Sequence, residues 1–125
     1  MVVDDLQPLL TEWQKRLRLQ DWDVQVSITR ERDMPIDSSR GAIRWNVNTK
    51  EAWLHILDPI DYPPDQVPQD IEQTIIHELL HLHLVMVAEM AGENETIQIT
   101  TEQAIVCISE ALVRLKREGV NQSSG

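Results

Sequence analysis

The first half of the chain changes from a helical to an extended pattern of apolar positions. Between residues 4 and 19, apolar side chains recur at the three- and four-residue spacing of one helix face. Between residues 22 and 30 they alternate with polar ones, which is typical of a half-buried strand. Two further strands are predicted at 42–48 and 52–58, joined by a turn around residues 48–50. The pattern therefore predicts an amphipathic helix followed by a small, largely antiparallel three-stranded sheet.

Four prolines between Asp58 and Gln69 separate these strands from a long apolar segment. Proline at this density excludes a helix or a central strand, so the stretch is predicted to be a stiff connector. Asp70 follows as a candidate N-cap, with Gln73 three residues later as its capping-box partner. The apolar residues beyond it would surround a helix on nearly every side, which is typical of a helix buried in the domain centre. We expect this helix to end near Ala91, before Gly92.

A last helix is predicted over residues 101–118. Thr100 and Gln103 form another capping-box pattern, and Gly119 is a suitable residue to end the helix. Apolar residues recur along it at helical spacing and mark one buried stripe. Cys107 lies among these apolar residues, so its thiol is expected to be packed in the core. Together with the strands, the helices predict an α+β domain.

Length and composition agree with one domain. A chain of 125 residues with 42% hydrophobic residues can bury a single core, which we assign to residues 1–120, with a polar, frayed tail at 121–125. The sequence contains no run of eighteen apolar residues, so no membrane span is expected. The first residues also lack the pattern of a secretory signal. With a single cysteine in the sequence, a cytoplasmic setting is the default expectation.

The charge of the chain limits its partners. The formal net charge is −10, which argues against nucleic-acid binding, because such proteins carry a basic surface. The same charge weakly favours basic partners or substrates, although solubility alone would explain it.

The candidate functional residues lie in one short motif on the predicted buried helix, His77-Glu78-Leu79-Leu80-His81. Histidines four residues apart lie one turn apart on the same helix face, so both imidazoles can bind one metal ion. Glu78 can reach a water molecule at that metal and act as a general base. This H-E-x-x-H spacing is the arrangement of zinc hydrolases, and histidine ligands with an open coordination position favour zinc. The alternative, two hydrogen-bonded core histidines, explains neither the inserted glutamate nor the spacing.

A catalytic zinc needs a third protein ligand. His83 lies about 200° around the helix from His81, so it points away from the metal and is assigned a structural or surface role. A longer arrangement would require glycine at position 84 and histidine at position 87. The chain has Leu84 and Val87 there, which excludes that arrangement.

The third ligand is therefore expected to be a carboxylate from the next helix. Glu102 stands in the first turn of the predicted 101–118 helix, within the arc of its packed face. A carboxylate on a packed face needs a partner, and a metal would supply one. The competing interpretation is an acid favoured by the helix dipole. Glu93 and Glu95, in the link before this helix, are the alternative ligands.

His77-Glu78-x-x-His81, followed after one loop by a glutamate that opens a helix, resembles the gluzincin family of zinc metallopeptidases. The short chain, with strands before the motif helix and one helix after it, is similar to the minimal single-domain members called minigluzincins. The resemblance covers residues 70–118 and implies a small zincin-like fold. It also implies zinc on His77, His81 and Glu102, with Glu78 as the base. Glu102 is followed by Gln-Ala-Ile-Val, so the downstream aspartate of larger gluzincins is absent.

The expected function is zinc-dependent hydrolysis of peptide bonds, with weak or latent activity because a small domain has little room for a deep cleft. Tyr62 and His55 are the candidate oxyanion stabilisers, although a structural role is favoured for each. The strand at 52–58 is expected to hold a peptide substrate by backbone pairing at the sheet edge.

A different class of function stays open. A zincin-like scaffold could bind metal structurally, or recognise a protein, without cleaving it. The intact Glu78 argues against this alternative, because a structural site has no use for a base. A zinc-free helical adaptor is the least favoured alternative, since it would leave His77 and His81 unpaired inside the core.

Overall fold

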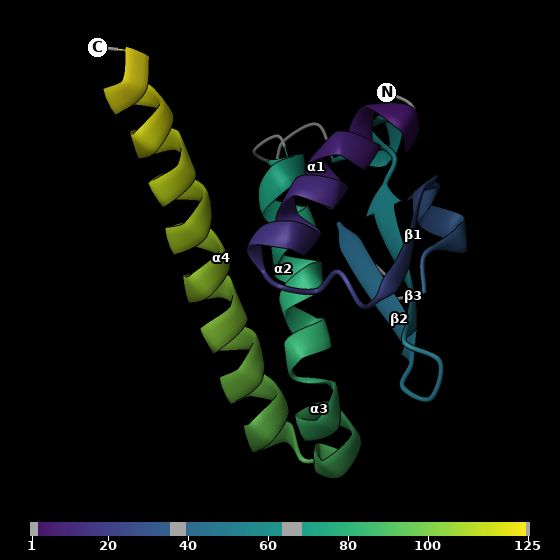
Figure 1. Cartoon of the computed structure of the whole chain (residues 1–125). Coiled ribbons are helices and arrows are strands. Elements are labelled where there is room, and N and C mark those ends of the chain that lie inside the picture. Colours follow the sequence, from purple (N-terminus) through teal and green to yellow (C-terminus); the bar gives the residue numbers. More distant parts are fainter. Residues whose placement is uncertain (1–2, 36–39, 64–68, 125) are drawn as a thin grey trace.

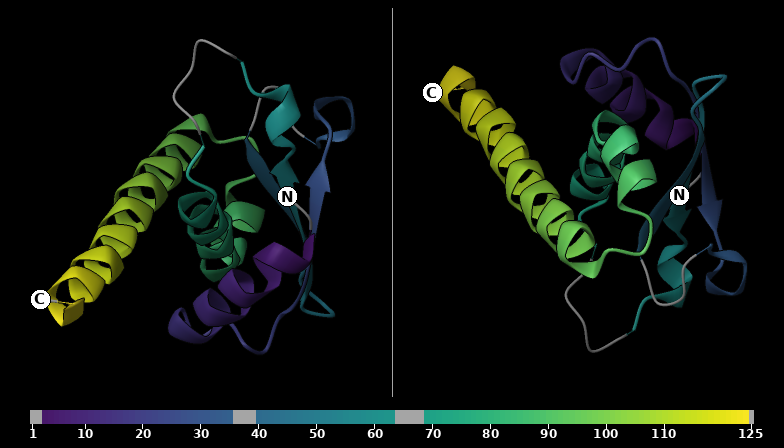
Figure 2. Two further views of the ribbon diagram at one scale, coloured as in Figure 1. Left: turned by 90° about the horizontal axis from the view of Figure 1, so that it is seen from above. Right: turned by 90° about the horizontal axis from the view of Figure 1, so that it is seen from below.

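The computed structural model describes residues 3–35, 40–63 and 69–124, arranged in three layers (Figures 1 and 2). The sheet forms one layer, α1 and α2 cover one of its faces, and α4 lies on the far side of α2. This arrangement confirms the predicted α+β class and the order of its main elements. In chain order the elements are α1 (Val3–Arg16), β1 (Asp23–Thr29), β2 (Gly41–Asn46), β3 (Glu51–Leu57), α2 (Ile71–His83), α3 (Val85–Ala91) and α4 (Glu95–Ser124), with single 3-10 turns at Glu31–Asp33 and Pro59–Asp61.

The sheet is mixed, with the strand order β1–β3–β2. β3 pairs with β2 antiparallel, but it pairs with β1 in parallel. β3 is therefore the central strand, and the prediction that 52–58 lies at the sheet edge is wrong. An alternating pattern tells which face of a strand is buried, and it does not tell which strands are neighbours. The edge strand beside α2 is β2.

The single helix predicted from Asp70 to Ala91 is two helices. α2 ends at His83, and α3 begins at Val85 after a bend of 67° at Leu84. The bend turns Val85 into the core and leaves most of α3 exposed. Apolar residues on every side fit a straight helix and a bent pair equally well, so the pattern could not reveal the break. No single described helix is long and apolar enough to cross a membrane; α2 and α3 reach that length only together, across the bend.

α4 extends beyond the predicted 101–118 helix at both ends. The side-chain oxygen of Asn94 accepts a hydrogen bond from the backbone N–H of Ile97 at 3.2 Å, and the helix begins at Glu95. It continues through Gly119 to Ser124, so the segment predicted to fray is helical, apart from Gly125, which lies outside the described residues. Cys107 is exposed rather than packed, because among the described elements α4 packs mainly against α2.

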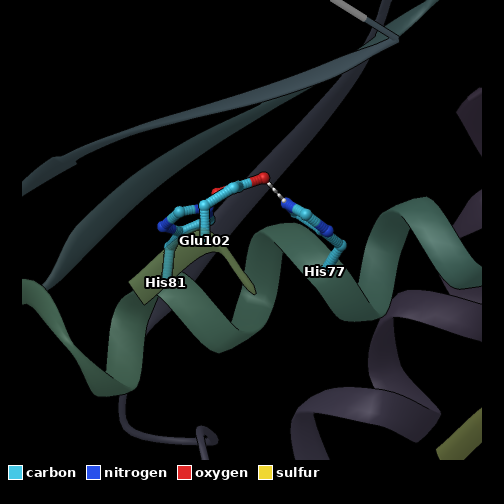
Figure 3. Close-up of side chains that lie close together, drawn as sticks. All are labelled: His77, His81 and Glu102. Carbon is cyan, nitrogen blue, oxygen red and sulfur yellow. Dashed lines mark ion pairs between the residues drawn. The ribbon is translucent and has the colours of Figure 1, made fainter. Parts of the chain in front are cut away.

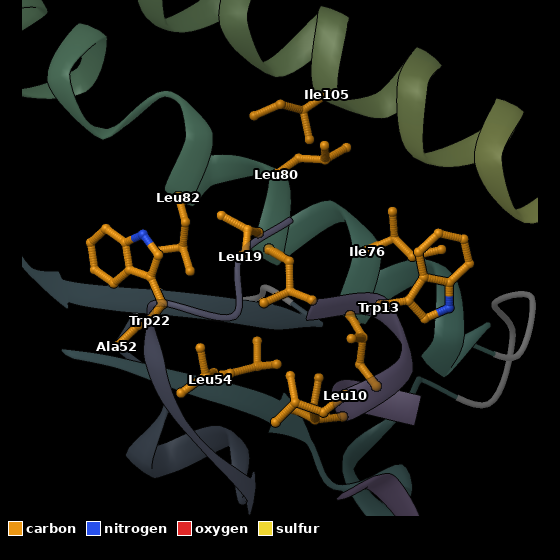
Figure 4. Close-up of a cluster of buried hydrophobic side chains, with 14 of the residues drawn as sticks. Leu10, Trp13, Leu19, Trp22, Ala52, Leu54, Ile76, Leu80, Leu82 and Ile105 are labelled. Carbon is orange, nitrogen blue, oxygen red and sulfur yellow. The ribbon is translucent and has the colours of Figure 1, made fainter. Parts of the chain in front are cut away.

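The main core lies between the sheet and the two helices that cover it (Figure 4). Trp13 on α1 and Trp22 before β1 are both buried in it and join the first helix to the sheet. α2 contributes its most buried face to this core, and Ile105 of α4 closes the core from the other side. The largest fully buried apolar side chains are Leu10, Leu54, Ile56, Ile75, Ile76, Leu79 and Ile105.

Asp70 caps α2 as predicted and also ties it to α4. Its Oδ1 accepts a hydrogen bond from the backbone N–H of Gln73 at 3.2 Å. Arg117 on α4 donates two hydrogen bonds to the carboxylate, at 2.7 and 3.0 Å. The guanidinium of Arg117 lowers the pKa of Asp70, despite the opposing effect of partial burial.

We predict that Asp70→Ala lowers the free energy of unfolding by about 1–2 kcal/mol at pH 7, since it removes both the cap and the ion pair. Asp70→Asn keeps the cap and should cost less. A lowered folded-state pKa stabilises the fold above the unfolded value of about 3.9, and this contribution is lost as the pH falls through the folded value. Urea denaturation of the parent and Asp70→Asn should therefore converge in acid. A constant difference at all pH values would contradict this account.

Candidate metal centre

α2 places the three charged or polar residues of the motif at one cavity. Its core face is directed at α1 and the centre of the sheet, whereas His77 and His81 lie on the side of the helix toward the edge strand β2 and α4. The two imidazoles are half-buried, with 20% and 25% of their side chains exposed. Their ring centroids are 5.4 Å apart, as expected for residues one helical turn apart on one face.

Glu102 on α4 lies directly over this histidine pair (Figure 3). Its Oε1 is 2.7 Å from Nε2 of His77, and its Oε2 is 3.4 Å from Nε2 of His81. One ligand atom from each of the three residues lies within 4.8 Å of the others. The structure thus brings together the three residues predicted as metal ligands, although α4 begins earlier than predicted.

The donor set and its spacing fit a zinc ion. Two nitrogens and a carboxylate oxygen about 2.0–2.2 Å from a tetrahedral metal lie roughly 3.3–3.5 Å from one another. Oε2 of Glu102 already lies at this distance from Nε2 of His81, at 3.4 Å. The 2.7 Å contact to Nε2 of His77 is made by the other oxygen, Oε1, so the carboxylate would need to turn for one oxygen to bind the metal beside both histidines. Three protein ligands leave the fourth position of a tetrahedral zinc for a reactant. The assignment of these residues as ligands stays a prediction.

Burial sets the protonation of two groups at this site. It lowers the pKa of His81, against the opposing attraction of Glu102, and so favours the neutral imidazole that can bind a metal. Glu78 is 8% exposed, and burial together with the negative charge of Glu102 raises its pKa to about 8. Without a cation nearby, the Glu78 carboxyl is therefore mostly protonated at pH 7.

The cavity over the motif has a volume of about 380 Å³. α2 forms its base through the motif residues, and Glu102 forms the wall on the α4 side. The opposite wall is the edge strand β2, which contributes Gly41, Ile43 and Trp45. A second hollow of about 440 Å³ lies between α1 and β1, and it contains none of the motif residues. The cavity over the motif is therefore the candidate functional site because of the residues that line it, and not because of its volume.

Gly41 allows β2 to approach α2 closely beside Glu78. A Cβ atom at this position would lie 2.5 Å from Cγ2 of Thr74 and 3.4 Å from Cγ of Glu78. The first distance is far below van der Waals contact, so a side chain would push the edge strand away from the helix. Glycine is therefore required here for close packing.

We predict that Gly41→Ala lowers the free energy of unfolding by about 1–3 kcal/mol. Gly119→Ala is the matched control, because a Cβ there meets nothing within 4 Å and the residue lies inside α4. Alanine should be neutral or stabilise the helix at position 119 by up to about 1 kcal/mol. Urea denaturation measures both. Equal effects of the two variants would show that β2 can move aside without cost.

Neither oxyanion candidate lies at this cavity. His55 points to the outer face of the sheet, where its Nδ1 is 3.3 Å from Ser27 Oγ and 3.2 Å from Thr29 Oγ1. Tyr62 packs against a small separate cluster that includes Met34 and Leu57. Neither residue lines the cavity with the motif residues, which agrees with the structural role favoured for each.

The alternative carboxylate ligands and His83 also lie apart from the ligand group. Glu93 lies in the turn before α4 and Glu95 is the first residue of that helix. Both are exposed, and neither belongs to the group formed with His77 and His81. His83 is exposed, and its Nε2 is 2.8 Å from the carbonyl oxygen of Leu17, which agrees with the structural or surface role predicted for it.

Ile43 and Trp45 are the cavity residues that the sequence pattern did not reveal. They alternate with outward-facing residues on β2, as expected, but only the strand order places β2 beside the motif. Trp45 is fixed by a hydrogen bond from its Nε1 to Oε1 of Glu89 on α3, at 3.1 Å.

Comparisons with protein-family models, with curated proteins and with solved structures gave no match for this chain. The resemblance to gluzincins therefore rests on the motif and on the residues that surround it.

Proposed function

We propose that this protein is a zinc-dependent peptide hydrolase of the gluzincin type. The observation that carries the proposal is the convergence of Glu102, from a separate helix, on the histidine pair of the H-E-x-x-H motif. The residues between His81 and Glu102 span the bend at Leu84 and the turn before α4. A carboxylate that returns over both imidazoles after such a path is the arrangement expected of a two-histidine, one-glutamate zinc site.

The proposed roles follow from position and chemistry. His77, His81 and Glu102 hold the metal. When bound, zinc acts as a Lewis acid toward a peptide carbonyl and acidifies water. Glu78 is buried beside the ligands, where the charge of a bound cation would lower its pKa and favour the carboxylate. As general base, Glu78 takes a proton from the attacking water and passes it to the leaving amine.

The proposed substrate is an extended polypeptide that lies along β2. Among the described strands β2 is an edge strand, so the side away from β3 can offer backbone groups for pairing. A peptide added there by backbone hydrogen bonds would cross the cavity in front of the motif. We therefore propose that β2, and not the strand at 52–58, pairs with the peptide substrate.

The experiment that tests the proposal combines metal analysis with a cleavage assay. Purified protein should contain one zinc ion per chain and should cut a reduced, unfolded protein substrate, with the new amino termini measured by mass spectrometry. Removal of zinc by a chelator should stop cleavage, and added zinc should restore it. Zinc binding without any cleavage would favour the non-catalytic scaffold. The absence of any bound divalent metal would refute both functions.

A further inference from the structure

Basic and acidic residues are unevenly distributed along the sequence around the metal centre. No lysine or arginine occurs between Lys50 and Arg114, whereas this segment contains twelve aspartate and glutamate residues. The segment forms β3, α2, α3 and the first two thirds of α4. α2 and the first two thirds of α4, which carries Glu102, are therefore free of basic side chains other than histidine.

Some of these acids are neutralised at a distance from the cavity. Three of them pair with basic residues from other parts of the chain: Asp61 with Arg30, Asp70 with Arg117, and Glu72 with Lys116. In contrast, no lysine or arginine among the described residues pairs with Glu89, Glu93 or Glu95, at the end of α3 and the start of α4. The turn between α3 and α4 thus keeps an unbalanced negative charge.

Glu89 is the member of this acidic group that reaches the cavity wall. The bend at Leu84 directs α3 so that Glu89 can accept the hydrogen bond from Trp45, which lines the cavity. Arg44 is the neighbour of Trp45 in the sequence and the basic residue of β2. Its side chain lies on the opposite face of the strand, where its charge acts on His55. Among the residues that the structure describes, no lysine or arginine therefore neutralises Glu89 on this face of β2.

A bound metal would not compensate this charge. The two positive charges of zinc are balanced by the carboxylates of Glu78 and Glu102, so the centre itself would be neutral. Glu89 would then supply the uncompensated charge at the α3 end of the cavity. The wall beside it is apolar, through Ile43 and the indole of Trp45.

We infer that this cavity selects a substrate with a lysine or arginine side chain, and that Glu89 is the specificity-determining residue. The inference rests on the proposed peptidase function and names its substrate class. The methylene stem of such a side chain would pack along Ile43 and Trp45, and its cation would meet Glu89. The indole of Trp45 attracts the same cation through its ring face. A neutral polar side chain would lose both electrostatic contributions.

The test uses two peptides that differ only in a lysine or a glutamine next to the cleaved bond. The parent protein should cut the lysine peptide with a kcat/KM about 5–10-fold higher, mainly through KM, because Glu89 does not contact the reacting atoms. Glu89→Gln, which can still accept the hydrogen bond from Trp45, should reduce this ratio to near 1. Glu110→Gln is the matched control, since it removes an exposed charge from α4 outside the cavity, and it should keep the ratio.

A binding measurement separates this inference from the proposed function. Zinc-loaded Glu78→Gln protein is titrated with each peptide by calorimetry, with and without the added substitution Glu89→Gln. Tighter binding of the lysine peptide that depends on Glu89 would support the inference even if the parent cut neither peptide. Equal cleavage and equal binding of the two peptides would overturn it and leave the peptidase function intact. A failure to bind either peptide would also overturn it.

Discussion

Glu78→Gln is expected to abolish peptide cleavage while zinc stays bound. Glu78 lines the cavity beside the three proposed ligands, but it is not one of them. Glutamine keeps the size and the burial of the side chain and removes its ability to take a proton. Loss of a general base typically costs about 10²–10⁴-fold, so kcat should fall by at least about 100-fold. The measurement is cleavage of an unfolded protein substrate at saturating concentration, beside zinc analysis of the same samples.

A folding control for this variant follows from the raised pKa of Glu78. In metal-free protein the pKa is about 8, above its unfolded value of about 4.3. The stability contribution of this group is therefore fully present below the unfolded pKa and is lost as the pH rises through about 8. Glutamine cannot ionise, so metal-free Glu78→Gln should exceed the parent in stability by up to a few kcal/mol at pH 9.

Two results would contradict the assignment of Glu78. Cleavage by zinc-loaded Glu78→Gln at a rate close to that of the parent would mean that another group takes the proton. Loss of zinc from the variant would place Glu78 among the ligands. Urea denaturation in the presence of a chelator distinguishes either result from simple unfolding of the variant.

The second large effect is expected from removal of a proposed ligand. His81→Ala should weaken zinc binding by more than about 100-fold, because loss of a residue that only hydrogen-bonds a metal ligand already costs about 10–100-fold. His83→Ala is the matched control: it removes a histidine from the same helix, two positions away, whose ring contacts Leu17 and not the ligand group. It should bind zinc as the parent does. Isothermal titration of chelator-treated protein with zinc measures both variants.

Zinc should also stabilise the parent but not His81→Ala. A ligand that binds only the folded state at 1,000 times its Kd adds about 4 kcal/mol, which corresponds to a rise of roughly 10–20 °C in Tm for a domain of this size. Thermal unfolding with and without zinc measures this difference. An equal rise in parent and His81→Ala would place zinc elsewhere on the protein.

The parts of the fold that depend on local patterns could be predicted from the sequence. Asp70 caps the motif helix because its side chain can accept a backbone hydrogen bond three residues on. The spacing of His77 and His81 is enough to place both rings on one face. The place of Glu102 on the side of α4 that faces α2 could be predicted from the helical spacing of the apolar residues around it, although half of its side chain is exposed.

The parts that depend on neighbours could not be predicted in the same way. Leu84 breaks the motif helix, yet apolar residues on both sides of it suit one long helix as well as two short ones. The alternation of apolar and polar residues along a strand does not show which strands are neighbours. The sequence therefore indicated neither that β3 is central nor that Trp45 lines the cavity. Cys107 is exposed because, among the described elements, α4 packs mainly against α2, which no local pattern records.

The central claim is that His77, His81 and Glu102 bind one zinc ion and leave a coordination position open. A crystal structure of the zinc-loaded protein tests it most directly. We predict a single zinc about 2.0–2.1 Å from Nε2 of both histidines and about 2.0–2.2 Å from a carboxylate oxygen of Glu102, with no fourth protein ligand. Zinc bound at another place, or a zinc ion on the two histidines with Glu102 turned to solvent, would contradict the claim.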